Sequence, residues 1–227
     1  MAENESPDER EPDRPTSTEL PASSRILSPP KRPGRGFLVV ALMFEASLGV
    51  AGLIGGWLFG LTFESMRIVP SENATAWVTD VAWGFAAAVP MFGGLVLLDQ
   101  RPPAALRRFR DEVARKVLPL FRPMGIGQLA LISTAAGVGE EILFRGLIQF
   151  GLHTAIGGPF GLVIGLLVAS TMFGVCHLLN LTYAILAALV GVYLGLLVLM
   201  TDNLLTPIVT HAAYDFAALV YLTRRPE

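Results

Sequence analysis

Long apolar stretches alternate with short polar segments from residue 37 to the C-terminus. Residues 37–63 carry a single charge, Glu45, and residues 81–98 carry none. Each stretch is long enough to cross about 30 Å of hydrocarbon as a helix. Four more apolar stretches follow, at residues 125–151, 160–179, 181–200 and 204–222. The pattern therefore predicts an all-α, polytopic transmembrane helix bundle of about six spans.

Two segments depart from this pattern. Residues 1–36 hold seven prolines, seven acidic and six basic residues, a composition that cannot bury enough apolar surface to fold alone. They are predicted to form a disordered tail. Residues 100–122 combine seven basic residues with apolar side chains at helical spacing, namely Leu106, Phe109, Val113, Val117 and Leu120. This segment predicts an amphipathic helix on the membrane surface, with a soluble linker helix as the alternative, and Pro119 should end or kink it.

Composition and charge agree with a membrane protein. The chain is 52% hydrophobic and only 16% charged, with a mean hydropathy of +0.55, which excludes an ordinary soluble domain. Basic residues concentrate in the tail, in residues 101–122 and at Arg224 and Arg225. The positive-inside rule therefore places both termini in the cytoplasm of a multi-pass cell-membrane protein. No nucleic-acid footprint is visible, and the lone Cys176 excludes an intramolecular disulfide.

Charged residues interrupt the apolar pattern at one place. No residue from 123 to 139 or from 146 to 201 is Asp, Glu, Lys or Arg, but Glu140, Glu141 and Arg145 lie between these stretches. Ionisable residues at membrane depth are costly and usually functional. Glu141 and Arg145 are four residues apart and are predicted to form an ion pair on one helix face. Glu140 points about 100° away around the helix and is therefore available for a function other than this ion pair.

Other predicted spans also carry polar side chains. The fourth span contains His177 with Asn180, and the sixth contains His211 and Asp215 four residues apart. Three helices thus contribute a carboxylate, two histidines and a further polar group, which together can perform general-base hydrolysis with a stabilised oxyanion. Glu45 on the first span has no visible partner, and we interpret it as structural.

Several other intramembrane chemistries do not fit the sequence. A rhomboid-type serine protease needs Gly-x-Ser-Gly, and neither Ser133 nor Ser170 lies in such a stretch. An aspartyl type needs Gly-x-Gly-Asp, which is absent, and so is the zinc signature His-Glu-x-x-His. These absences leave a glutamate-centred hydrolase, with or without a metal.

Three ordered motifs resemble those of the CPBP family, the CAAX prenyl endopeptidases and bacteriocin-processing proteins also called ABI. The motifs are Glu140-Glu141-x-x-x-Arg145, Phe173-x-x-x-His177-x-x-Asn180 and His211-x-x-x-Asp215. The resemblance implies that Glu140 is the general base that activates a water and that His177 helps to hold this water. It further implies that His211 and Asp215 stabilise the oxyanion, with Glu141 and Arg145 as a structural pair.

One motif position departs from the family. The last position is commonly Asn in prenyl endopeptidases, and here it is Asp215. Because an ionised carboxylate would repel an oxyanion, Asp215 must be protonated, must orient His211 or must bind a metal. Two histidines with carboxylates are a common zinc ligand set, and a metal-free glutamate mechanism is the alternative. The sequence leaves the cofactor open.

The sequence therefore predicts an intramembrane endopeptidase. The chain is predicted to comprise a disordered cytoplasmic tail (residues 1–36) and two N-terminal transmembrane helices (residues 37–99). A basic amphipathic interfacial helix (residues 100–122) and a catalytic transmembrane core (residues 123–227) follow. The expected partners are membrane lipid and a membrane-anchored protein or peptide substrate, prenylated or otherwise lipidated. The alternatives are a non-catalytic scaffold or immunity-type binding protein, and a transporter or proton relay. The oligomeric state is left open.

Overall fold

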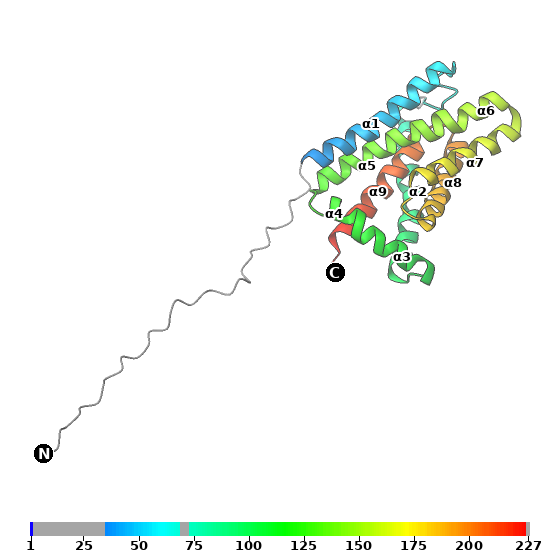
Figure 1. Cartoon of the computed structure of the whole chain (residues 1–227). Coiled ribbons are helices and arrows are strands. Elements are labelled where there is room, and N and C mark those ends of the chain that lie inside the picture. The colour runs from blue at the N-terminus through cyan, green and yellow to red at the C-terminus, as the bar shows by residue number, and fades with distance from the viewer. Residues whose placement is uncertain (2–34, 69–72, 226–227) are drawn as a thin grey trace. The chain divides into compact units, whose positions relative to one another are not determined.

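The computed structural model describes residue 1 and residues 35–68 and 73–225. The predicted disordered tail therefore lies almost entirely outside the described residues. Within the described ranges, all regular secondary structure is helical, which confirms the predicted all-α fold (Figure 1). The α-helices are α1 (Arg35–Leu58), α2 (Ala74–Gln100), α3 (Ala104–Glu112), α4 (Leu118–Phe121), α5 (Ile126–Glu141), α6 (Phe150–Ile156), α7 (Gly158–Cys176), α8 (Leu181–Thr201) and α9 (Leu205–Arg224).

Five of the described helices are long and apolar enough to cross a membrane, namely α1, α2, α7, α8 and α9. The third predicted span has a composite structure. Helix α5 continues without a break into a π-helical segment, η2 (Ile142–Gln149), and then into α6. Together with this composite helix, the five candidate spans agree with the predicted number of about six. The protein is a multi-pass membrane protein.

The predicted interfacial helix is interrupted by a second π-helical segment. This segment, η1 (Val113–Val117), lies between α3 and α4, and its last turn is closed by a hydrogen bond from the Leu118 N–H to the Val113 carbonyl. A π turn holds more residues than an α turn and so changes the register of the inward face. Accordingly Leu118 is only 7% exposed, whereas Leu120, predicted to face inward, is 38% exposed. Pro119 lies directly after this wide turn, and α4 ends two residues later.

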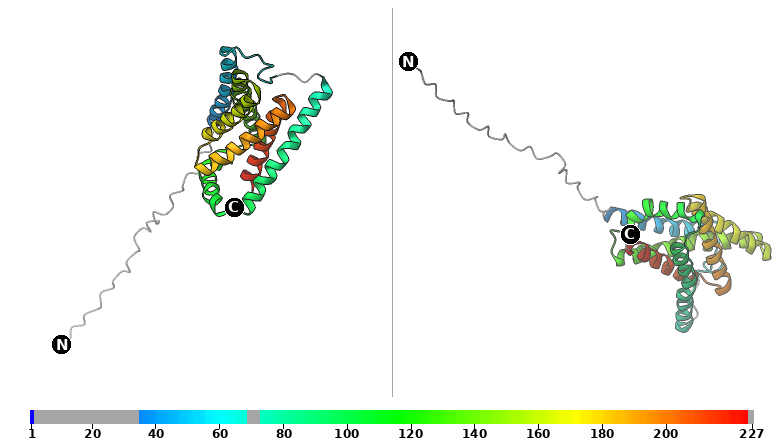
Figure 2. Two further views of the ribbon diagram at one scale, coloured as in Figure 1. Left: turned by 90° about the vertical axis from the view of Figure 1, so that its right-hand side faces the viewer. Right: turned by 90° about the horizontal axis from the view of Figure 1, so that it is seen from below.

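Helix α5 lies at the centre of the described helices. It packs against α1 and α9, and α9 in turn packs against α2 (Figures 1 and 2). Helices α7 and α8 form a second closely packed pair, and η2 joins this pair to α1. The composite helix that carries Glu140, Glu141 and Arg145 therefore contacts most of the other spans.

Glycine permits the close approach of α1 to α5. A Cβ atom added at Gly139 would lie only 2.1 Å from the carbonyl oxygen of Glu45. A Cβ atom added at Gly49 on α1 would lie 3.3 Å from the Cα atom of Gly139. Backbone atoms cannot move away as a flexible side chain can, so these two helices can cross at this distance only because Gly139 has no side chain.

We predict that Gly139→Ala destabilises the protein by about 1–3 kcal/mol, because the new methyl group overpacks a backbone contact. The measurement is the thermal unfolding temperature of purified protein in one detergent. Gly127→Ala on the same helix is the matched control, since a Cβ atom there meets nothing within 4 Å. A Gly139→Ala protein that unfolds at or above the wild-type temperature would show that the crossing tolerates a side chain.

Candidate active site

A fully buried ion pair lies at the junction of α5 and η2. Arg145 Nη1 donates to Glu141 Oε1 over 2.9 Å, and both side chains are 0% exposed. Arg145 Nη2 also donates to the carbonyl oxygen of Gly191 on α8 over 3.0 Å. The pair expected from the four-residue spacing therefore also ties the composite helix to α8.

The same carboxylate oxygen holds a histidine from α9. His211 Nδ1 lies 2.9 Å from Glu141 Oε1, and His211 is itself buried. A carboxylate oxygen shared with an arginine acts as an acceptor, so Nδ1 of His211 carries the proton and donates. His211 Nε2 is then directed toward Asp215, with 3.5 Å between Nε2 and Asp215 Oδ2. Glu141 thus orients His211, a role that sequence reasoning missed because the two residues lie 70 positions apart.

His177 is held at the C-terminus of α7. Its backbone caps the helix, and its Nδ1 donates to the carbonyl oxygen of Phe173 over 2.8 Å. This bond satisfies one of the carbonyl groups that a helix end leaves without a partner. The imidazole also stacks on the Phe173 ring, with 4.5 Å between centroids and 27° between planes. Both contacts follow from the four-residue spacing and leave Nε2 free.

The free nitrogen of His177 faces Glu140. His177 Nε2 and Glu140 Oε2 lie 3.9 Å apart, which is too far for a direct hydrogen bond but suitable for two groups that share one water. Glu140 is 6% exposed, and its Oε2 has no hydrogen-bond partner among the described residues. The carboxylate and the imidazole are thus placed to hold a water between them.

Phe173 packs against most of the charged and polar groups of the site. The guanidinium carbon of Arg145 lies 4.7 Å from the centroid of the Phe173 ring, a cation–π contact. His211 approaches the ring edge-on, with 5.8 Å between centroids, and Phe144 does so at 5.2 Å. The aromatic ring therefore excludes water from the ion pair and fixes the positions of both imidazoles.

Asn180 lies apart from these residues, and its assignment to the fourth span was wrong. Helix α7 ends at Cys176, and Asn180 is the N-cap of α8, where its Oδ1 accepts from the Tyr183 N–H over 2.9 Å. Its Nδ2 donates to Glu112 Oε2 on α3 over 3.0 Å. This hydrogen bond lowers the pKa of Glu112, an effect that Lys116 reinforces. Asn180 thus connects α8 to the interfacial helix.

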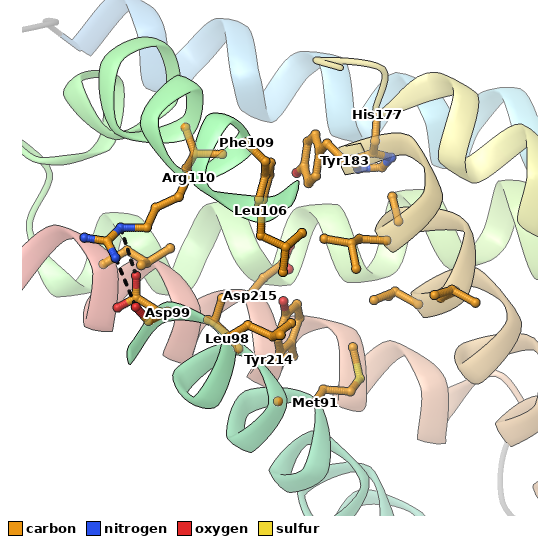
Figure 3. A pocket seen from close by; sticks show the side chains of 18 of the residues that line it. Met91, Leu98, Asp99, Leu106, Phe109, Arg110, His177, Tyr183, Tyr214 and Asp215 are labelled. Carbon is orange, nitrogen blue, oxygen red and sulfur yellow. Dashed lines mark hydrogen bonds and ion pairs between the residues drawn. The ribbon is translucent and has the colours of Figure 1, made fainter. Parts of the chain in front are cut away.

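A cavity of about 950 Å³ lies beside the two histidines, and Figure 3 shows His177 among the side chains that line it. Its wall includes His177, His211 and Asp215, together with Tyr183 and Tyr214. The sequence placed the polar groups on the third, fourth and sixth predicted spans. The cavity lies instead among α2, α8, α9, the interfacial helix and the end of α7, and Glu140 does not line it. The difference arises because α9 lies between α2 and α5.

An ionic cluster lies at one end of this cavity. Asp99, at the end of α2, accepts from the hydroxyl of Tyr221 over 3.0 Å and pairs with Arg110, whose Nε lies 3.7 Å from Oδ1 (Figure 3). Arg225 also contacts Asp99 Oδ2. The cluster joins α2, α3 and the end of α9. No local sequence signal identified Asp99, because its partners are distant in the chain.

The described residues do not present a ready set of metal ligands. Nowhere in residues 35–68 and 73–225 do three His, Cys, Asp or Glu side chains converge so as to hold a metal ion. The reason is visible at His211, whose Nδ1 is bonded to Glu141 and whose Nε2 faces Asp215. A zinc ligand set, one of the two alternatives that the sequence left open, therefore does not fit this arrangement, and the residues are considered below without a metal.

Comparison with known proteins gives one family match. The family model described as type II CAAX prenyl endopeptidase Rce1-like matches residues 122–217. No curated protein and no solved structure matches the chain. The matched segment runs from the end of the interfacial helix into α9 and includes all three motifs. Over residues 122–217, the chain is therefore similar to the Rce1-like family of type II CAAX prenyl endopeptidases.

Proposed function

We propose that this protein is an intramembrane endopeptidase in which Glu140 activates a water to hydrolyse a peptide bond of a membrane-anchored protein or peptide. The family supports a CAAX-type intramembrane protease in general. The observation that carries the finer proposal is the convergence of Glu140 from α5, His177 from the end of α7 and His211 from α9. Two of the three also line a large cavity.

Glu140 and His177 supply the nucleophile. His177 donates through Nδ1 to Phe173, so its Nε2 can accept a hydrogen bond from water. Glu140 takes a proton from that water as the water oxygen attacks the carbonyl carbon of the substrate. The C–N bond then breaks as the proton passes from Glu140 to the leaving nitrogen, which yields a carboxyl group and an amine.

His211 and Asp215 act on the carbonyl oxygen of the substrate. Glu141 fixes the His211 ring through Nδ1, and Nε2 and Asp215 both face the cavity. With a proton on each ring nitrogen, His211 also donates through Nε2 and stabilises the negative charge that develops on the oxygen. Of the three roles open to Asp215, the 3.5 Å separation from His211 Nε2 supports the orientation of His211 or a protonated carboxyl that donates to the oxyanion.

The cavity suits a lipidated substrate. Apolar side chains from α2 and α8 form much of its wall, including Met91, Leu95, Leu186 and Val190, and such a wall accepts a prenyl or acyl chain. Tyr183 stacks on Phe109 of the interfacial helix, with 5.2 Å between centroids, and His177 lies near both. We therefore place the reaction at the cytoplasmic edge of the bilayer, with both termini in the cytoplasm. The same proposal divides the chain into a tail, two N-terminal helices, an interfacial helix and a catalytic core, with boundaries at residues 36, 99 and 122.

We predict that Glu140→Gln abolishes proteolysis without unfolding the protein, because the amide cannot accept the proton of the water. Loss of a general base costs about 10²- to 10⁴-fold in rate. The measurement compares protein N- and C-termini by mass spectrometry in membranes of cells that express either form at matched levels. Termini present only with the native protein would identify both the activity and its substrates.

Glu64→Gln is the matched control, since Glu64 is an exposed carboxylate away from the site. Its termini should coincide with those of the native protein. If Glu140→Gln gives the same termini as well, and both proteins are folded and abundant, the non-catalytic scaffold or immunity-type binding protein becomes the better account.

We predict that Asp215→Asn leaves the rate of hydrolysis unchanged or raises it, because an uncharged amide can donate to the oxyanion as a protonated carboxyl does. The measurement is the initial rate of cleavage of a farnesylated peptide with a free C-terminus, with products quantified by mass spectrometry. Glu64→Gln is a control for the removal of one acidic charge, since Glu64 is exposed and does not line the cavity. A drop of roughly tenfold or more with Asp215→Asn would instead assign the carboxylate an essential role, either in orienting His211 or in binding a metal.

A further inference from the structure

Glu45 is an unexplained acid on α1, a helix with one face packed on the composite helix and the other exposed. Several of its neighbours are exposed and apolar, including Met43 and Phe44. The Glu45 side chain turns inward, and its Oε2 is buried without a hydrogen-bond partner among the described residues. An unpaired carboxyl oxygen at membrane depth is costly, so its presence requires a compensating function.

The backbone of α1 places this acid beside Glu140. The carbonyl oxygen of Glu45 lies directly against Gly139, the residue that precedes Glu140. Glu45 is close enough to interact electrostatically with Glu140, His211 and Asp215. The acid that appeared isolated in the sequence therefore adjoins the candidate catalytic groups.

The available partners restrict what Glu45 can do. The buried cation of the site, Arg145, is already bonded to Glu141 and to the Gly191 carbonyl. Within the part of the chain that the structure describes, Glu45 Oε2 has no hydrogen-bond partner. The Oε2 atom of Glu140 is also buried without a partner. Two carboxyl groups that lie close together in a low-dielectric site cannot both be ionised and tend to share one proton.

We propose that Glu45, in its acid form, donates a hydrogen bond to Glu140 Oε2 and is the positioning residue for the general base. A proton shared by these two oxygens satisfies both unpartnered atoms. It also fixes the plane of the Glu140 carboxylate, so that the second lone pair of Oε2 is directed to the water that His177 holds. This inference rests on the proposed role of Glu140. It is separate from the family match, because Glu45 lies outside residues 122–217.

The first test does not require catalysis. Infrared spectra of the purified protein should contain a band from a buried carboxylic acid that is lost in Glu45→Gln and shifted in Glu140→Gln. Glu64→Gln, which removes an exposed carboxylate, should leave this band unchanged. The proposal is overturned if Glu45→Gln removes no such band, or if the Glu45 band is the same with and without Glu140.

The second test separates positioning from packing. Glu45→Met keeps the volume but removes the donor, and it should lower kcat for the farnesylated peptide by about 10- to 100-fold, as is typical when the support of a catalytic group is lost. KM should be unchanged. Glu45→Gln retains an N–H donor and should restore most of kcat. Equal loss of kcat in both variants, or a change confined to KM, would contradict a positioning role.

The two tests also distinguish this inference from the proposed function. If the infrared result is as expected but no form of the protein cleaves any peptide, the hydrogen bond between the two acids stands and the protease proposal fails. If the native protein cleaves the peptide and the infrared band does not depend on Glu45, the protease stands and the role of Glu45 is refuted.

Discussion

One carboxylate oxygen holds the centre of this protein together. Glu141 Oε1 accepts from both Arg145 and His211 at 2.9 Å, in a region from which water is excluded. Arg145 extends the connection to Gly191, so that α5, η2, α8 and α9 meet at one charge. Breaking a buried pair by removing one partner typically costs about 3–5 kcal/mol, because the remaining charge is left uncompensated. The positions of the candidate catalytic helices therefore depend on this contact.

The two histidines are oriented in the same way. Each donates through Nδ1 to a fixed acceptor of the protein, which is Glu141 for His211 and the Phe173 carbonyl for His177. Each consequently presents Nε2 to the site. The Phe173 ring lies between them and also covers the Arg145 guanidinium. A single packed aromatic side chain thus links the ion pair, which is structural, to the imidazoles, which face the cavity.

Much of the site could be predicted because its key pairs are local. Glu141 with Arg145, Phe173 with His177 and His211 with Asp215 are each four residues apart, and helix geometry alone brings such residues together. Asn180 was grouped with His177 on the fourth predicted span, although it lies between the apolar stretches 160–179 and 181–200. Its cap hydrogen bond to Tyr183 and its bond to Glu112 on α3 decide that boundary.

The sequence by itself determined the all-α membrane fold, the approximate number of spans and the residues that share one helix face, because hydropathy and helical periodicity act over one to a few turns. Only the tertiary structure decided that Glu141 orients His211, that the cavity lies along α2 and α8, and that Glu45 adjoins Glu140. These features depend on how closely two helices can approach each other. At the crossing of α1 and α5 the approach is set by the absence of a side chain at Gly139, a property of the packed pair that no local pattern records.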